Sequence, residues 1–427
     1  MKLYYKYVIF FMIAFMFFGA IFYYVYSYRN FLVNKEVIKV GVLFSQSGTM
    51  ELTEKTIINA TLLAIDEVNK SGILPGVRLE PVVYDGASNW ERFAFLARKM
   101  ILKDKVKVIV GCWSSSCRKA VKSVVEKYNN LLIYPTQFEG TEESHNIVYL
   151  GAAPNQQVIP GISWMFDHYG KKVYLIGSDY IYPHVANEII LADVKSLGGE
   201  IVGVKYLPLG SNDVGDVIND IIKKRPDFIV NTINGSTNIA FFTQLNALTT
   251  GIKRIPVISF SVSDAEVNKI GIDKYKGNYQ VWSYFTLLDT PENKAFLKAY
   301  QKKYGNVNNI SDPAITAYAG LKLWTQGLAQ AITQSVDLNP NIIRGFMLRQ
   351  SIASPAGVIY IDPFNAMAWR TVLISKVNDQ GKMDIVWSSK SPIEPVNYMN
   401  SKTKTEWDLF EYQLYTKWNE AWENLSN

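Results

Sequence analysis

Short apolar runs alternate with segments of helical periodicity along this chain, and this alternation limits the possible folds more than any other feature. In the first half, apolar runs occupy residues 37–44, 79–84, 106–110 and 131–134, and hydrophobic residues between them recur every three or four positions. A polar stretch at 151–157 interrupts the pattern, and a second strand and helix series follows it. Regular alternation of this kind is typical of α/β folds with a doubly wound parallel sheet. We therefore expect two such lobes.

The length of 427 residues exceeds that of one ordinary domain. The elements predicted after residue 283 lack a full sheet of their own, so we expect the chain to cross between the lobes several times. Two lobes joined in this way would form a hinged clamp with a cleft between them. The predicted division is a membrane anchor or signal segment at 1–36, a first lobe at 37–154 and 283–350, a second lobe at 155–282 and 351–400, and a helical tail at 401–427.

The N-terminal region contains an uncharged, apolar run at residues 7–26. Such a run is long enough to cross a bilayer core about 30 Å thick, which predicts one transmembrane helix. Lys2 and Lys6 precede the run and favour a cytoplasmic N-terminus. No small-x-small cleavage site follows, so an anchor is favoured over a cleaved export signal, which stays open. In either case we expect the rest of the chain at the periplasmic or extracellular face of the cytoplasmic membrane.

Composition excludes several classes of protein. A hydrophobic fraction of 48% with 19% charged residues is typical of a folded chain and excludes broad disorder. The net charge of +6 comes from scattered Lys and Arg residues, so no nucleic acid partner is expected. Cys112 and Cys117 lie close together at the start of one predicted helix. We expect small buried side chains there rather than a disulfide or a metal site.

No motif of an enzyme is present in the sequence. It contains no G-x-S-x-G, no H-E-x-x-H and no phosphate-binding glycine loop. The three histidines, His145, His168 and His184, lie far apart, and nothing groups a nucleophile with a base. We expect no catalytic residues and no cofactor, with an enzyme acting on an amide as the remaining alternative.

Hydroxyl and aromatic side chains follow several predicted strands, at the edge where open α/β sheets bind ligands. Ser115 and Thr136 come shortly after two neighbouring strands of the first lobe, and Tyr180 and Tyr182 follow a strand of the second lobe. Helix capping explains a single serine at such a turn equally well. Two hydroxyl sites at adjacent strand ends, with aromatic walls opposite, favour binding of a small, flat, polar molecule.

Taken together, these blocks resemble the type I periplasmic binding proteins, specifically the branch that binds urea and short-chain amides. The resemblance spans about residues 38–395. It rests on several blocks in order: GCWSSSCRKAV from Gly111, YPTQFEG from Tyr134, GAAPNQQ from Gly151 and GSDYIYP from Gly177. It implies two α/β lobes, a hinge and an inter-lobe cleft that closes on the ligand.

The resemblance also implies a ligand-binding set in this chain: Trp113, Ser115, Tyr134, Thr136, Tyr180 and Tyr182. It leaves urea, acetamide and formamide open, because Trp113 is typical of the transporter receptors and the second tyrosine is typical of an amide sensor. The turn at 362–369 lacks the histidine that is usual in this branch.

Two functions follow from the resemblance. The first is a receptor that captures urea or a short-chain amide and delivers it to the permease subunits of an ABC transporter. The alternative is a membrane-anchored sensor that passes occupancy to a signalling partner such as a sensor kinase. An amino-acid ligand is a variant that would require Glu139, Asp264 or Glu266 to reach the cleft and hold an α-ammonium group.

Overall fold

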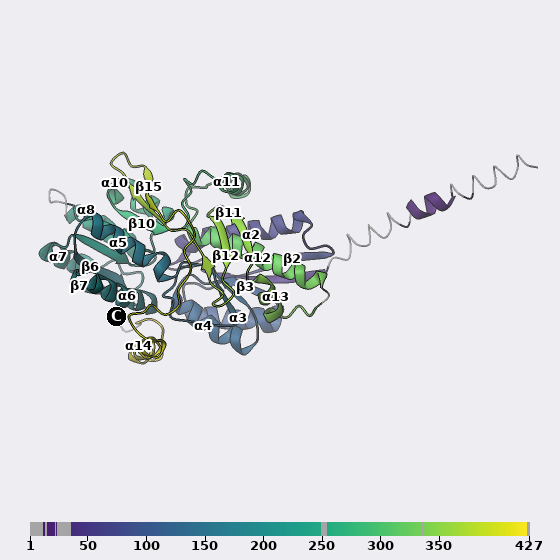
Figure 1. Cartoon of the computed structure of the whole chain (residues 1–427), viewed down its shortest axis with the longest axis horizontal. Coiled ribbons are helices and arrows are strands. Elements are labelled where there is room, and N and C mark those ends of the chain that lie inside the picture. Colours follow the sequence, from purple (N-terminus) through teal and green to yellow (C-terminus); the bar gives the residue numbers. More distant parts are fainter. Residues whose placement is uncertain are drawn as a thin grey trace, which may run out of the picture.

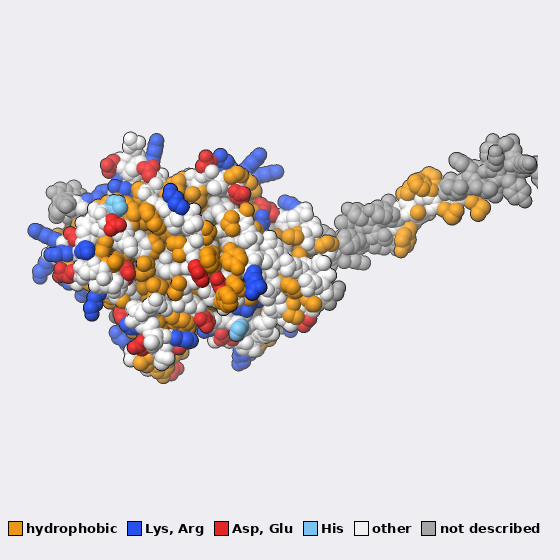
Figure 2. Space-filling view, viewed as in Figure 1, with side chains coloured by type: hydrophobic (Ala, Val, Ile, Leu, Met, Phe, Trp, Pro, Cys, Tyr) orange, Lys and Arg blue, Asp and Glu red, His pale blue; other side chains and the backbone are white. Residues whose placement is uncertain are grey.

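The computed structural model describes residues 36–248, 254–334 and 336–424, together with Met12, 15–21 and Tyr23. Most of the predicted transmembrane run at residues 7–26 lies outside the described residues. Among those described, no helix is both long enough and apolar enough to cross a bilayer. Figure 1 shows two lobes arranged along the long axis of the body. Figure 2 shows acidic, basic and apolar side chains interspersed over the same face.

The first lobe is built on a five-stranded parallel sheet with strand order β2-β1-β3-β4-β5. Its strands are β1 (Glu36–Phe44), β2 (Val77–Asp85), β3 (Val108–Gly111), β4 (Leu132–Tyr134) and β5 (Ile147–Tyr149). Helices α2 (Glu51–Ser71) and α12 (Asp312–Thr333) share one apolar cluster with the sheet, while α3 (Trp90–Lys99) and α4 (Ser115–Lys127) share another. Side chains alternate along the strands, so Val42 joins the first cluster and Leu43 the second.

The second lobe is built on a seven-stranded sheet with strand order β15-β14-β10-β9-β8-β6-β7. Its strands are β6 (Lys172–Ser178), β7 (Glu200–Leu207), β8 (Phe228–Thr232), β9 (Val257–Ser259), β10 (Tyr279–Trp282), β14 (Leu373–Val377) and β15 (Met383–Ser388). Helices α5 (Val158–His168) and α6 (Ile181–Ser196) lie on one face; α7 (Gly215–Lys224), α8 (Thr237–Leu248), α9 (Asp264–Ile270) and α10 (Ile272–Tyr275) lie on the other. The strands from β7 to β10 pair in parallel, and β14 and β15 add an antiparallel edge.

The remaining elements connect or extend the lobes. They are α11 (Pro291–Tyr304), α13 (Pro340–Met347), β11 (Ser351–Ser354), β12 (Gly357–Ile361), β13 (Ala368–Trp369) and α14 (Lys404–Lys417). Strands β11, β12 and β13 form a small antiparallel sheet that packs on the α12 side of the first lobe. In the turn at 362–369, the Asp362 carboxylate accepts from the Phe364 N–H at 2.8 Å and from Trp369 Nε1 at 3.0 Å. This turn is thus closed by a carboxylate rather than by a histidine.

The chain crosses between the lobes at three places, and one buried arginine contacts all three. The crossings follow β5, β10 and β13. Arg370, on the third crossing, donates to the Leu150 carbonyl at 2.8 Å and to Ser283 Oγ at 3.0 Å, which lie on the other two. Its guanidinium also pairs with Asp312 at 2.7 Å and donates to Thr316 Oγ1 at 2.6 Å, both on α12. These contacts hold the three crossing segments and α12 together at the hinge.

We predict that Arg370→Gln lowers the free energy of unfolding by about 3–5 kcal/mol, because it leaves the buried Asp312 carboxylate without its cation. The matched control is Arg78→Gln, which breaks an exposed pair with Glu80 and should cost at most about 1 kcal/mol. Guanidinium chloride denaturation of both variants measures the difference. Equal losses in the two variants would show that the Arg370 contacts do not stabilise the hinge.

Candidate ligand site between the lobes

The ends of β3 and β4 place the predicted residues of the first lobe. Tyr134, the last residue of β4, donates its hydroxyl to the Trp113 carbonyl at 2.7 Å. Thr136 Oγ1 donates to the Cys112 carbonyl at 3.3 Å, so the loops after the two adjacent strands are bonded together. Ser115, the first residue of α4, donates its hydroxyl to Glu139 Oε2 at 2.6 Å. All of these side chains are buried.

The loop between β3 and α4 is closed by a disulfide between Cys112 and Cys117. The prediction of two unlinked cysteines is therefore wrong. It treated their spacing as helical, whereas Cys112 has a φ of 70° and the helix begins only at Ser115. This turn brings the two Cα atoms to 5.6 Å, within the range that a disulfide spans. Ser114 caps the helix by accepting from the Cys117 N–H at 3.2 Å. Because the disulfide joins Cys112 to Cys117, Trp113 and Ser115 lie within the small covalent ring that it closes.

The predicted residues of the second lobe lie at the start of α6. Tyr180 is its N-cap and Tyr182 belongs to its first turn, with ring centroids 6.4 Å apart. Burial, together with the charges of Tyr134, Tyr182 and Glu139, raises the pKa of Tyr180. Trp113 Nε1 reaches across the boundary and donates to Asn234 Oδ1 at 3.3 Å. The structure thus gathers five of the six predicted residues at the inter-lobe boundary, with Thr136 bonded to the loop beside them.

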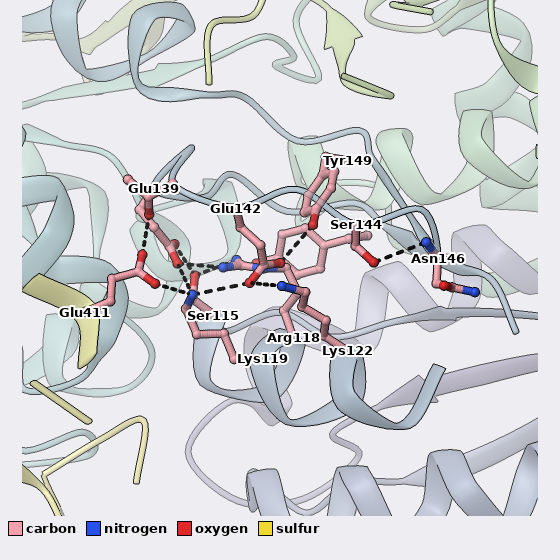
Figure 3. Close-up of polar contacts among 12 residues, drawn as sticks. Ser115, Arg118, Lys119, Lys122, Glu139, Glu142, Ser144, Asn146, Tyr149 and Glu411 are labelled. Atoms are coloured by element: carbon pink, nitrogen blue, oxygen red, sulfur yellow. Dashed lines mark hydrogen bonds and ion pairs between the residues drawn. The ribbon is translucent and has the colours of Figure 1, made fainter. Parts of the chain in front are cut away.

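Sequence reasoning did not assign Arg118, which organises the first-lobe half of this site (Figure 3). Its guanidinium is fully buried and donates to Ser115 Oγ at 2.8 Å, to Glu139 at 2.5 Å and to Glu142 at 3.0 Å. Burial acts to raise the pKa of Glu139, but the charges of Arg118 and Lys119 outweigh it and hold that pKa below its usual value. The charges beside the site are therefore paired with one another.

Two polar atoms at the boundary have no hydrogen-bond partner among the described residues. They are Gln137 Oε1 and the Tyr182 hydroxyl, both buried. The Gln137 amide nitrogen donates across the boundary to the Phe260 carbonyl at 3.2 Å and to Ser261 Oγ at 3.1 Å. Burial raises the pKa of Tyr182, whereas the nearby Ser261 and Gln137 side chains act to lower it. Buried polar atoms are usually bonded, and each exception requires an explanation.

The three acids considered for an α-ammonium group are all engaged by other side chains. Glu139 is held by Arg118 and Ser115. Glu266 accepts from Thr53 Oγ1 of the first lobe at 2.8 Å and from the Ser263 N–H at 2.8 Å. Asp264 accepts from Thr286 at 3.0 Å, and burial raises its pKa to about 7.

Comparison with known proteins identifies the family. Residues 38–404 match the sequence profile described as "Periplasmic binding protein domain". The chain belongs to this family. The leucine-, isoleucine-, valine-, threonine- and alanine-binding protein of Pseudomonas aeruginosa is 20% identical over 340 residues, covering 79% of this chain and 88% of that protein. Limonene hydroxylase of Geobacillus stearothermophilus is 33% identical over 117 residues, and the match spans only 21% of that protein.

Solved structures of similar fold include two solute-binding proteins. One is from R. palustris in complex with 4-hydroxybenzoate, with a TM-score of 0.76, 23% identity, and coverage of 86% of this chain and 100% of that chain. The other is the branched-chain amino acid binding protein of Streptococcus pneumoniae in complex with isoleucine, with a TM-score of 0.71, 21% identity, and coverage of 84% and 100%. These likenesses confirm the predicted α/β fold of the type I periplasmic binding proteins.

We predict that Glu142→Gln reduces the acid sensitivity of the fold. Burial opposes ionisation of Glu142, but Arg118 and Lys119 lower its pKa below the usual 4.5. A depressed pKa adds stability that is present above pH 4.5 and is lost as pH falls, at up to about 1.4 kcal/mol per pH unit. The free energy of unfolding, measured between pH 5 and 3, should therefore fall less steeply in the variant. Glu143→Gln, at the exposed neighbouring position, should leave the slope unchanged; equal slopes in all three proteins would contradict the prediction.

Proposed function

We propose that this chain is an extracytoplasmic receptor that closes its two lobes on urea or a short-chain amide and delivers it to an ABC transporter permease. One observation carries the proposal. Gln137 Oε1, an acceptor, and the Tyr182 hydroxyl are both buried and make no hydrogen bond of normal geometry among the described residues. A primary amide offers N–H donors for the first and a carbonyl oxygen for the second.

The surroundings of these two groups suit a small neutral molecule. Trp113, Tyr134 and Tyr180 supply flat apolar walls that exclude water. Ser115 and Thr136 complete the proposed set, at the strand ends of the first lobe. Each unpaired buried polar group costs about 1–3 kcal/mol, so a ligand that pairs both groups stabilises the closed clamp.

A charged ligand fits the described contacts less well. A carboxylate such as 4-hydroxybenzoate would need a free cation, but Arg118 already donates to Ser115, Glu139 and Glu142. An amino acid would in addition need an acid for its ammonium group, and Glu139 is already paired with Arg118, whereas Asp264 and Glu266 accept only from neutral groups among the described residues. Displacing the Arg118 pairs would leave a buried charge without a partner, at a cost of several kcal/mol.

The proposed location and partners follow from the same reasoning. Disulfides persist in oxidising compartments outside the cytoplasm, and the Cys112–Cys117 bond supports a location at the periplasmic or extracellular face. We propose that residues 7–26 anchor the chain to the cytoplasmic membrane, with the permease as the neighbour that receives the ligand.

Calorimetry and thermal shift of the full chain with millimolar urea, acetamide, formamide, leucine and 4-hydroxybenzoate test the proposal. We expect saturable stabilisation by urea or an amide that follows the logarithm of ligand concentration. Saturable binding of leucine or 4-hydroxybenzoate, with no response to urea or any amide, would overturn the amide assignment.

Two substitutions test the predicted contacts. Tyr182→Phe and Gln137→Leu should each weaken amide binding about tenfold, because each removes one hydrogen bond to the ligand. Tyr182→Phe removes a hydroxyl that has no partner, so it should not lower stability without ligand. Tyr412→Phe is the matched control, because its hydroxyl lies on the exposed face of α14. Unchanged affinity in Tyr182→Phe would place the ligand elsewhere.

A further inference from the structure

The C-terminal segment at residues 403–424, which we call the strap, contacts both lobes. Its helix α14 begins with a capping box formed by Thr403 and Glu406. Figure 1 shows α14 on the side of the body where α6 and α4 lie. After the helix, the chain continues along the start of α6 to Asn424.

The contacts of the strap with the second lobe are largely apolar. Trp407 is fully buried and Trp418 is 3% exposed, and both share an apolar cluster with Tyr180, Tyr182 and other residues of α6. Main-chain bonds extend this contact, because the Ile181 N–H donates to the Trp422 carbonyl at 3.0 Å. The strap therefore packs directly behind the two tyrosines of the proposed ligand site.

The contacts of the strap with the first lobe are fewer and largely polar, and Trp90 of α3 also packs against the cluster that contains Trp407 and Trp418. Glu411 pairs with Lys119 at 2.7 Å and accepts a hydrogen bond from Thr141 (Figure 3). Ser116 Oγ donates at 3.1 Å to the Trp422 carbonyl, the same atom that accepts from Ile181. A single carbonyl thus bonds to the first turn of a helix in each lobe.

We propose that the strap ties the lobes together in the closed clamp and must release the first lobe before ligand can exchange. A hinge motion separates the lobes, so a segment bonded to both has to break one set of contacts. The apolar contacts with α6 are the larger set, whereas those with the first lobe are an ion pair, a few hydrogen bonds and the packing of Trp90. The strap therefore moves with the second lobe. The claim that the strap must release before ligand exchanges rests on the proposed function, whereas the claim that the strap ties the lobes does not.

Hydrogen exchange of the full chain without ligand tests the tie. The readout is a pair of segments at a separate inter-lobe contact, residues 49–54 and 260–267, where Thr53 bonds Glu266 and Phe260 accepts from Gln137. Ending the chain after Lys402 should raise exchange there about tenfold, and Glu411→Gln roughly threefold. Asp408→Asn is the matched control, because within the described part of the chain Asp408 forms its ion pair with Lys404 on the same helix, and it should leave these segments unchanged.

Faster exchange confined to the residues beneath the strap, in both the shortened chain and Glu411→Gln, would overturn the inference. Glu411→Gln keeps the test decisive if the shortened chain does not fold.

Ligand kinetics provide the second measurement, with acetamide and urea as probes. If release of the strap precedes exchange, Glu411→Gln should raise the association and dissociation rate constants together, each roughly threefold, and leave the affinity nearly unchanged. A purely structural role would raise only the dissociation rate constant and would contradict the inference. Should neither probe bind, the amide assignment fails, and the exchange measurement alone decides whether the strap ties the lobes.

Discussion

The buried contacts of Arg370 are the constraint on which the two-lobed architecture depends. A cation without solvent is costly unless every donor is paired, and here Asp312, Ser283, Thr316 and the Leu150 carbonyl supply the acceptors. These groups lie on the three crossings and on α12, so the charge can be satisfied only when the crossings converge. Because hydrogen bonds are directional, this convergence fixes the angle at which the two sheets meet, and with it the distance between the strand ends that face each other.

A second buried arginine, Arg118, gives the site its electrostatic character. It neutralises Glu139 and Glu142 and fixes the Ser115 hydroxyl, while Lys119 extends the network to Glu411 of the strap. The charges cancel locally, so a site that contains several ionised groups nevertheless presents neutral hydrogen-bonding atoms. Two of these, on Gln137 and Tyr182, lack partners among the described residues, and in the proposed function they are the groups that a neutral amide would pair.

Local sequence patterns predicted much of the fold, because burial on both faces makes β3 and the central parts of β1 and β6 apolar runs. The hydroxyls of Ser115 and Thr136 were likewise predictable from their positions after neighbouring strands. Strand β5, which follows a polar segment, was not predicted. The disulfide was missed because the left-handed conformation of Cys112 has no signal in a non-glycine residue. No local pattern in the sequence signalled three further residues whose hydrogen-bond partners lie elsewhere in the chain: Arg118, Gln137 and Asn234. Trp113 and Asn234, for example, are 121 positions apart, and local periodicity carries no information about such pairs.

The strap and the site belong to one mechanical unit. The rings of Tyr180 and Tyr182 face the proposed ligand on one side and share an apolar cluster with Trp407 and Trp418 on the other. A motion of α6 relative to the first lobe therefore changes the ligand contacts and the strap contacts at the same time. The Glu411–Lys119 pair is 2.7 Å long and almost fully buried, so its strength depends on the exclusion of water, which only the closed clamp provides. Opening of the clamp therefore has to break the strap contacts with the first lobe as well as the contacts around the proposed ligand.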